Sequence, residues 1–506
     1  MKSLKCATYL DGLHIVDVES TFSRGLPGFS IVGLAGSSIK ESSERVKSAL
    51  LALNFSFPAQ KITINLSPSD IPKNGSHFDL AIALLIALER KESLEKIFVF
   101  GELGLDGSIK STANLFSLLL FLSTKVQSAK VLVPSSIAHK ASAIPNLEIY
   151  GVSSLNDAIN FLKDHNFAET CKHENSHEIF KNTIEIEGEK YLPNQNFTLD
   201  FADILGQTRA KRACLIAAAG MHNIIFEGSP GCGKSMCAKR LVYIMPPQSL
   251  KEVLSAAAYR SLNLQDSEFS SIRAFRAPHH TSTKSSIFGG GSNIAKIGEI
   301  ALANGGVLFF DEFVHFPKQL IESLREPLED HKIHISRVNS KVTYETKFLF
   351  AAALNPCPCG KLFSKELTCT CTQSEINRYK SRLSEPILDR IDLYVQMDEV
   401  ASNDRADVSS KELHEQVLKA FKFCKKRGQA ESNGKLNDAD VTKFCLLQDE
   451  AKEMLELGIK RFALSQRGIK KILKVARTIA DLEQSQLIEK THIIEALSFR
   501  TKRDSI

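Results

Sequence analysis

The sequence lacks any apolar run long enough to cross a membrane. Its apolar runs, such as residues 115–122, are far shorter than the roughly 18 residues that a spanning helix needs. The first five residues are not followed by the apolar region of a signal peptide. We therefore expect a cytoplasmic protein that has no membrane partner.

The cysteines do not form the even, regular pattern of a disulfide framework. There are 11 of them in 506 residues, and they are unevenly spread. Free thiols or metal ligands fit such a pattern better than disulfides do. The net charge of +6 is modest, and its basic excess falls in residues 201–506. This balance is compatible with a polyanionic partner but does not require one.

One stretch carries a specific chemical signal. Residues 228–235 fit the phosphate-binding pattern G-x-x-x-x-G-K-[ST], between a strand-like and a helix-like run. Lys234 is expected to reach the β- and γ-phosphates of ATP, and the Ser235 hydroxyl is expected to hold Mg²⁺. Because Cys232 lies at the start of the helix, we also expect its thiolate to be favoured. The full set expected to bind ATP is Gly228, Ser229, Pro230, Gly231, Cys232, Gly233, Lys234 and Ser235.

A second stretch has the form of a Walker B strand. Residues 306–310 are apolar and end in Asp311 and Glu312. Asp311 is expected to hold the Mg²⁺, and Glu312 is expected to act as the general base on the attacking water. The order of the two stretches predicts a motor-type ATPase rather than a chance match to either motif.

Three further polar residues follow or begin predicted elements. Asn355 ends the strand 348–354, at the place where AAA+ ATPases keep a polar residue facing the γ-phosphate. Arg390 precedes the strand 393–395 and is a candidate arginine finger; in the alternative reading it pairs with Asp389 or Asp392. Arg467 lies in the first turn of a helix that Ser465 caps. A cation there opposes the helix dipole, so we expect Arg467 to reach ATP as a second sensor.

Two pairs of cysteines form a candidate metal centre. Cys357 and Cys359 are followed by Cys369 and Cys371, each pair with one residue between its members. Four thiolates are a suitable tetrahedral set for Zn²⁺. The alternative is four reduced thiols in a loop.

Two segments of the ATPase part suggest contacts with DNA. His279 and His280 are neighbours, and neighbouring side chains on a strand point to opposite faces, so a structural or DNA-loop role is favoured over metal binding. Residues 334–338 and 342–345 predict a β-hairpin with a polar tip. Arg337 and Lys341 could contact a phosphate backbone from it, or be ordinary surface charges.

The N-terminal part reads as a separate domain of class α/β or α+β, because residues 1–165 alternate strand-like and helix-like runs. The stretches 65–75 and 101–107 resemble the non-ATPase domain shared by the Lon protease and the RadA recombination protein. Lon-type proteases carry a nucleophilic serine two residues after the glycine that corresponds to Gly75, where this chain has His77. Ser76 would replace it only in a slipped loop, so we predict no protease activity.

The polar and acidic residues 166–200 are expected to form a solvated linker. Its histidines and their neighbour His165 have no strand or turn framework that would hold a metal.

With these pieces in place, the chain resembles the YifB/ComM family of magnesium-chelatase-like AAA+ ATPases over nearly all of its length outside residues 166–200. The most specific stretches are 275–280, 298–300, 306–312, 355–360, 382–392 and 475–482. The resemblance implies an α/β protein with three parts. They are a Lon-protease- or ribosomal-S5-like α+β domain over 1–165, an AAA+ P-loop α/β domain over 201–400 and a helical lid over 401–506.

The resemblance also implies a homo-hexameric ring that hydrolyses ATP with Mg²⁺. ComM proteins of this family are DNA helicases that drive branch migration during natural transformation, so a motor acting on single-stranded or branched DNA is expected. The alternative is a chelatase-type motor that remodels a protein partner. A Lon-like protease is disfavoured by His77.

Overall fold

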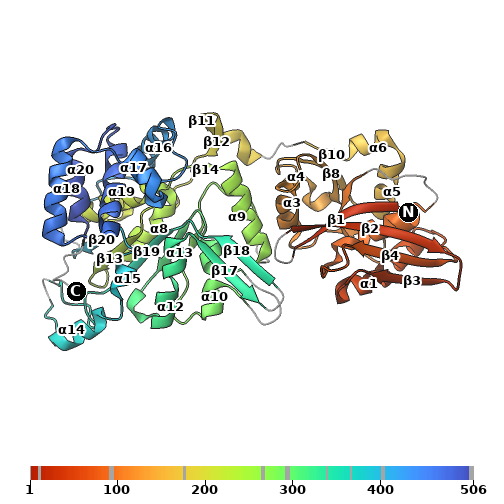
Figure 1. Ribbon diagram of the computed structural model, residues 1–506, viewed down its shortest axis with the longest axis horizontal. Coiled ribbons are helices and arrows are strands. Elements are labelled where there is room, and N and C mark those ends of the chain that lie inside the picture. The colour runs from red at the N-terminus through yellow and green to blue at the C-terminus, as the bar shows by residue number, and fades with distance from the viewer. Residues whose placement is uncertain are drawn as a thin grey trace. The chain divides into compact units, whose positions relative to one another are not determined.

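The computed structural model describes residues 2–9, 13–89, 96–174, 178–263, 268–290, 297–337, 340–364, 367–399 and 405–500 (Figure 1). The chain divides into two compact units. The first comprises residues 1–181 with two short pieces, 257–268 and 338–342, and the second comprises 182–256, 269–337 and 343–506. None of the described helices is both long and apolar enough to cross a membrane.

The first unit is built on an eight-stranded mixed sheet of order β10-β9-β8-β5-β1-β2-β4-β3. Its strands are β1 Lys2–Tyr9, β2 Leu13–Ser23, β3 Gly28–Val32, β4 Lys61–Ser67, β5 Phe98–Val99, β8 Ala129–Pro134, β9 Leu147–Val152 and β10 Lys172–His173, with a small pair β6 Glu102–Leu103 and β7 Ile109–Lys110. Its helices are α1 Ser37–Ala52, α2 Asp79–Ala87, α3 Leu115–Ser123, α4 Ser135–Ala141, α5 Leu155–Lys163 and α6 His165–Thr170. Helix α2 is apolar on all sides, and residues 79–86 are all buried, so it forms the centre of this core.

His77, which stands where a Lon-type nucleophile would be, belongs to that core. It lies in a short 3₁₀ turn that leads into α2 and is 1% exposed. Its Nε2 is 2.9 Å from the carbonyl oxygen of Ala7. Burial lowers the pKa of His77 to about 4, so the side chain is a neutral packing group. The neighbouring Ser76 hydroxyl donates a hydrogen bond to Glu102.

Residues 166–200 contain more regular structure than a solvated linker. Strand β10 pairs with β9, and β11 (Ile184–Ile186) and β12 (Glu189–Leu192) form a hairpin. β12 also pairs with β14 (Gln248–Ser249) in the second unit. Tyr191 and Leu192 are buried there, which explains why this polar stretch folds. Of its histidines, His173 lies in β10 and His177 falls outside the described residues.

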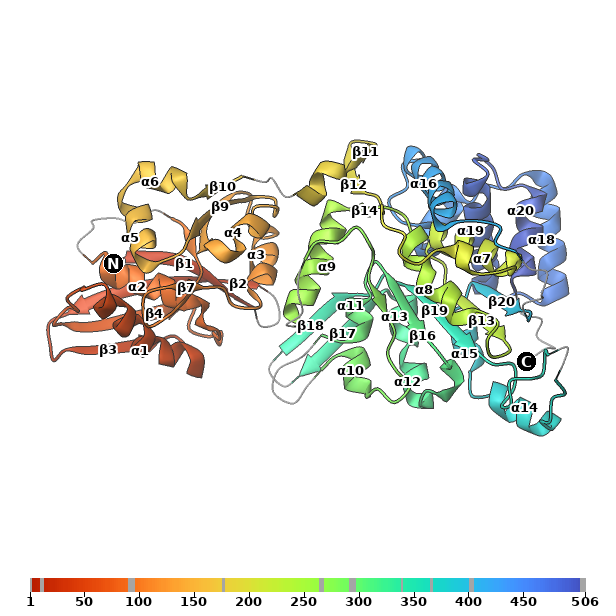
Figure 2. The same ribbon diagram turned by 180° about the vertical axis from the view of Figure 1, so that it is seen from behind.

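The second unit contains a five-stranded parallel sheet of order β15-β16-β19-β13-β20. The strands are β13 Ile224–Gly228, β15 Phe275–Arg276, β16 Val307–Phe310, β19 Leu349–Leu354 and β20 Leu393–Met397. Helices α7 (Thr208–Gly220) and α8 (Lys234–Ile244) pack against this sheet (Figure 2). β13, β16 and β19 are buried along their whole length, and β16 and β19 read as unbroken apolar runs, as is typical of a parallel sheet.

The C-terminal residues form a helical part that shares one hydrophobic core with the sheet. It consists of α16 Ser410–Lys426, α17 Asp438–Phe444, α18 Asp449–Phe462, α19 Gln466–Leu482 and α20 Lys490–Ser498. The Ser465 hydroxyl accepts a 3.1 Å hydrogen bond from the Gly468 N–H, which confirms the predicted cap of α19. A mixed α/β fold with a parallel sheet and a helical C-terminus fits an AAA+-like protein.

Further helices lie between these parts. They are α9 Leu250–Leu262, α10 Lys284–Phe288, α11 Glu299–Leu302, α12 Lys318–Ser323, α13 Arg325–Glu329, α14 Gln373–Lys380 and α15 Glu385–Leu388. The predicted hairpin is present as β17 (Lys332–Arg337) paired with β18 (Ser340–Glu345). The side chains of Arg337 and Lys341 lie outside what the structure describes.

Candidate nucleotide site

Several of the predicted site residues follow the carboxyl ends of neighbouring parallel strands. Residue 227 at the end of β13 lies opposite Leu354 at the end of β19, so the P-loop and Asn355 leave the sheet side by side. β16 is paired with β19 on its other side, and Asp311 follows it directly. Ligands of open parallel sheets bind at this edge, and the structure brings Lys234, Asp311 and Asn355 together there.

Lys234 points into the loop that precedes it. Its Nζ is 2.5 Å from the Gly228 carbonyl oxygen, 2.9 Å from the Ser229 carbonyl oxygen and 3.2 Å from Oδ1 of Asn355. The side chain is 9% exposed, and its burial lowers the pKa of Lys234. A partly desolvated ammonium group that contacts carbonyl dipoles is well suited to bind a phosphate. The phosphate has a full negative charge and interacts with the ammonium group more strongly than a carbonyl does.

The two predicted Mg²⁺ ligands are in direct contact. The Ser235 hydroxyl donates a 2.8 Å hydrogen bond to Oδ2 of Asp311. Oδ1 of the same carboxylate accepts a 3.0 Å hydrogen bond from the Glu312 N–H. Both groups offer hard oxygen atoms, so the donor set fits Mg²⁺, which uses few protein ligands beside phosphate and water.

Glu312 has an unusual backbone conformation beside this pair. Its φ is 51°, in the left-handed region, which costs about 1–2 kcal/mol for a residue other than glycine. Such residues concentrate at functional sites. Its carboxylate is exposed, and Oε2 lies 3.9 Å from Nδ1 of His280. This placement leaves a carboxylate free to meet a water molecule at the edge of the sheet.

The contact between His280 and Glu312 was missed by the sequence reasoning. His279 and His280, whose rings lie 4.1 Å apart, follow β15 in a loop rather than standing on a strand. β15 is parallel to β16 and next to it in the sheet. The residues that follow its carboxyl end therefore reach the same edge as Glu312. The pairing of these two parallel strands could have predicted the contact between His280 and Glu312.

The prediction that Cys232 favours the thiolate is wrong. The residue is 2% exposed, and burial raises the pKa of the Cys232 thiol even though Lys234 acts in the opposite direction. Desolvation of the charged form outweighs the favourable position at a helix start.

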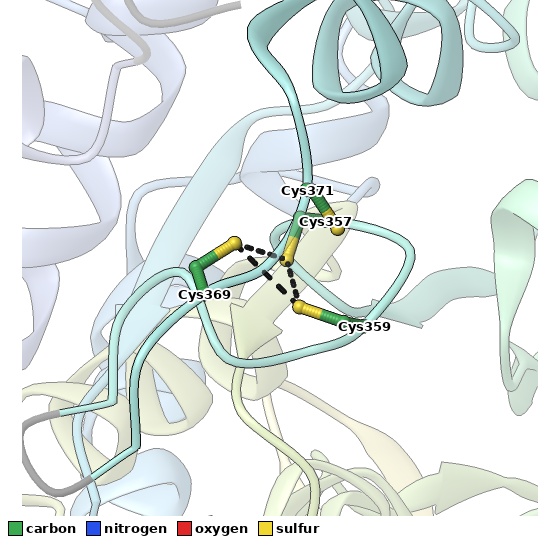
Figure 3. A group of neighbouring side chains, drawn as sticks. All are labelled: Cys357, Cys359, Cys369 and Cys371. Atoms are coloured by element: carbon green, nitrogen blue, oxygen red, sulfur yellow. Dashed lines mark hydrogen bonds between the residues drawn. The ribbon is translucent and has the colours of Figure 1, made fainter.

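The four predicted cysteines converge (Figure 3). The Sγ atoms of Cys357 and Cys359 are 3.4 Å apart, and those two atoms lie 3.7 and 3.5 Å from Sγ of Cys369. With Cys371 included, all four sulfur atoms lie within 4.8 Å of one another. Four sulfurs around one Zn²⁺ at a bond length of ~2.3 Å would be about 3.8 Å apart, so this spacing fits a tetrahedral thiolate site.

Backbone groups also favour the charged form of one of these thiols. Hydrogen bonds from the Lys361 and Thr370 backbone lower the pKa of Cys359 to about 5. Amide-to-sulfur hydrogen bonds are the kind of outer support that metal ligands commonly have.

The cysteine loop is joined to the nucleotide site at both ends. It begins two residues after Asn355, whose side chain contacts Lys234. Gly360, with φ of 75°, lies against the P-loop, where a Cβ atom would come within 2.8 Å of Cδ of Pro230. The loop ends at α14, which carries Tyr379. The Asn355 backbone hydrogen-bonds to this tyrosine, and burial raises the pKa of Tyr379 to about 12.

Two predicted residues, Arg390 and Arg467, do not join this group. The Asn223 side chain donates a 2.9 Å hydrogen bond to the Arg390 carbonyl oxygen, which places Arg390 at the amino end of the sheet. The Arg390 guanidinium contacts the Arg325 carbonyl oxygen at 3.2 Å and forms an ion pair with Glu329. This partner replaces the alternatives Asp389 and Asp392. Arg467 is paired with Glu329 as well.

A parallel sheet with a P-loop, an acidic strand end and a helical C-terminus is the arrangement of an AAA+-like ATPase. Comparison with protein families agrees with this class. Residues 200–405 match the model of magnesium chelatase, subunit ChlI, residues 18–137 match subunit ChlI of Mg-chelatase, and residues 407–500 match the ChlI C-terminal part.

Comparison with individual proteins identifies a family within this class of ATPase-like proteins. The chain is 36% identical to the competence protein ComM of Haemophilus influenzae over 502 residues, which cover 96% of this chain and 94% of that protein. It is 35% identical to the YifB proteins of Salmonella typhimurium and Escherichia coli, again over 96% of this chain and 94% of each relative. The chain therefore belongs to the YifB/ComM family of magnesium-chelatase-like proteins.

Proposed function

We propose that this ATPase is a ring-shaped motor that moves single-stranded or branched DNA. The observation that carries the ATPase assignment is the meeting of Lys234, the Ser235–Asp311 pair and Asn355 at one edge of the parallel sheet. The similarity to a competence protein, together with the resemblance to DNA helicases of the same family, supports DNA as the substrate of the motor.

The residues of the site divide the work of hydrolysis. Lys234 and the loop N–H groups bind the triphosphate, and Ser235 and Asp311 hold the Mg²⁺. When bound, the metal neutralises charge on the phosphate oxygens. Glu312 accepts the proton of the attacking water. Asn355, which already contacts Lys234 at 3.2 Å, orients the terminal phosphate.

A complete site needs a second copy of the chain. Arg390 lies at the amino edge of the sheet, whereas the phosphate loop follows its carboxyl edge. We assign Arg390 and Arg467 to the nucleotide bound by the neighbouring subunit. There the guanidinium groups meet the charge that spreads over the phosphoryl oxygens. A hexamer is the ring size that the family resemblance implies.

The other parts of the chain complete the proposal. The β17–β18 hairpin is the element that contacts the DNA strand. The four cysteines hold one Zn²⁺, because their spacing suits tetrahedral thiolate ligands. The N-terminal unit has the Lon-protease- or S5-like fold without its chemistry, since a buried histidine occupies the nucleophile position.

The decisive experiment is the rate of ATP hydrolysis with and without forked DNA. We expect forked or single-stranded DNA to raise the rate severalfold, whereas duplex DNA of equal length raises it less. Lys234→Ala gives the background, since it removes the phosphate contact. If active protein responds to no DNA but is stimulated by a protein fraction, the chelatase-type alternative is correct and the DNA assignment is wrong.

A further inference from the structure

Glu329 joins two arginines that come from different parts of the second unit. It ends α13, shortly after the acidic strand end. Its Oε2 forms an ion pair with Nη2 of Arg390, and its Oε1 forms one with Nη2 of Arg467. Arg467 lies in the first turn of α19, 138 residues further along the chain. One carboxylate therefore connects the sheet-based part with the helical part.

The two arginines depend on Glu329 to different degrees. The Arg390 guanidinium also donates to the carbonyl oxygens of Arg325 and Pro386, and its side chain is only 10% exposed. Within the described residues, Arg467 donates to Glu329 alone, and its side chain is 47% exposed. Glu329 thus fixes Arg467 beside an arginine that is already held, and most of the five N–H donors of Arg467 stay available to an anion.

The charge of Glu329 also offsets an unfavourable position of Arg467. The first turn of α19 has the partial positive charge of a helix N-terminus, which repels a cation. Helix α19 has no acidic residue in its first turn. Glu329 supplies the missing negative charge from another element, so it stabilises Arg467 where the helix alone would not.

Arg390 lies at the end of the sheet opposite to the phosphate loop of its own chain. In the register of β20 with β13, Leu393 is opposite Ile224, and Met397 is opposite Gly228. Four steps along a parallel strand span about 13 Å. Arg390 precedes Leu393 by three residues, so it lies beyond the amino end of that span, whereas the P-loop begins at its carboxyl end.

We propose that Glu329 is a positioning residue that presents Arg390 and Arg467 together to the terminal phosphate of a nucleoside triphosphate bound to a second copy of this chain. The inference rests on the shared site proposed above. Glu329 itself does not touch the nucleotide. It sets the spacing of the two guanidinium groups that meet the charge of the phosphate.

The first test is the variant Glu329→Gln, which keeps the shape of the side chain but removes its charge. We expect kcat for ATP hydrolysis to fall about 10- to 100-fold, the usual result of a misplaced reacting group. The affinity for a fluorescent ATP analogue should not change, because Lys234 and Ser235 have no contact with Glu329. Glu329→Asp, which keeps the charge on a shorter stem, should recover part of the rate.

The matched control is Glu326→Gln. Glu326 lies one turn earlier on α13 and is exposed, so it tests the same charge change on the same helix. Its rate and nucleotide affinity should equal those of the unchanged protein. If Glu329→Gln lost nucleotide binding together with activity, the residue would support the fold, and the positioning role would be wrong.

The second test asks which side of the subunit interface Glu329 serves. Glu329→Gln mixed with Lys234→Ala should regain activity, because some interfaces then join an intact P-loop to an intact arginine pair. Glu329→Gln mixed with Arg390→Ala should regain none, since both changes affect the same side. Wild-type kcat in Glu329→Gln, or no recovery with Lys234→Ala in rings that have exchanged subunits, would overturn the inference. Full activity of Arg390→Ala alone would instead overturn the shared site beneath it.

Discussion

Single residues at the carboxyl edge of the sheet carry the proposed chemistry, and Glu312 is the most constrained of them. Its left-handed backbone is unusual for a residue other than glycine, and its carboxylate is exposed. The strain is maintained by a framework in which Asp311 accepts the Glu312 N–H and the Ser235 hydroxyl. This framework separates metal binding, which needs Asp311, from proton transfer, which we assign to Glu312.

That separation gives a direct prediction. Glu312→Gln should bind ATP with unchanged affinity but turn over at least about 100-fold more slowly, because the amide accepts no proton. Lys234→Ala should lose ATP binding itself. Lys239→Ala, an exposed lysine on the same helix α8, is the matched control and should behave like the unchanged protein. Calorimetric binding and steady-state hydrolysis measure the two effects, and turnover of Glu312→Gln at the normal rate would assign the base elsewhere.

His77 predicts how stability depends on pH. Its folded pKa of about 4 lies below the ordinary value of 6.5, so below pH 6.5 the unfolded chain binds a proton that the folded core refuses. Stability should therefore be complete above pH 6.5 and fall by up to about 3 kcal/mol as the pH drops to 4. His77→Gln should make this dependence shallower in urea unfolding and leave the part due to other buried histidines such as His331, whose pKa burial also lowers, whereas the exposed His165→Gln should keep the dependence whole. An equal slope in both variants would contradict a neutral, buried His77.

The predictable residues are those whose position follows from a strand end. Lys234, Asp311 and Asn355 lie together because parallel strands bring their carboxyl ends to one edge, and their roles toward ATP stay predictions. Glu329 escaped the sequence analysis because its two partners are distant in sequence and the contact depends on how helices pack. The prediction of a low pKa for the Cys232 thiol was wrong for a different reason. The favourable position at a helix start was outweighed by burial, which only the whole fold determines.

Among the elements, the loop between β19 and α14 links the candidate metal centre to the nucleotide site. Asn355 begins it, and Gly360 packs against Pro230 within it. A metal held by the four thiolates would fix both contacts at once. The hairpin β17–β18 was predictable from its alternating pattern, whereas β11–β12 was not, because its short strands are set in a polar, acidic stretch.

We therefore expect zinc removal to weaken ATP binding. Purified protein kept reduced and free of chelators should contain about one zinc per chain. Cys369→Ser should reduce that content and lower ATP affinity, and added Zn²⁺ should restore both in chelator-treated unchanged protein. Cys171→Ser, a change far from the four-cysteine loop in sequence, serves as the control. Metal analysis that finds no zinc would exclude the site. Normal ATP affinity in zinc-free protein would show that the metal site does not support the P-loop, without excluding the site itself.

At the scale of the whole molecule, the sheet and the C-terminal helices share one hydrophobic core. The P-loop, Arg390 and Arg467 therefore all belong to one compact unit. The sequence motifs predicted this class of ATPase and its family. They did not predict that the helical part would merge with the sheet into one compact unit, because a shared core depends on side-chain packing across the whole unit.

A mixing experiment tests the shared site. Arg390→Ala and Lys234→Ala should each be inactive alone, since an arginine finger is worth roughly 10³–10⁵ in rate. Mixed rings should regain part of the activity, because some interfaces combine an intact loop with an intact arginine. Lys234→Ala mixed with a Lys234→Ala, Arg390→Ala double variant is the control and should stay inactive. Absence of recovery in rings shown to have exchanged subunits would remove Arg390 from the reaction.

The placement of the phosphate loop and Arg390 at opposite ends of one sheet affects where and when ATP is hydrolysed in the cell. If no single chain holds a complete site, a dilute pool of free chains is an idle store that consumes almost nothing. The rate of ATP hydrolysis per chain then rises with protein concentration. Any factor that gathers chains at one place, such as a DNA junction, raises ATP hydrolysis there and not elsewhere.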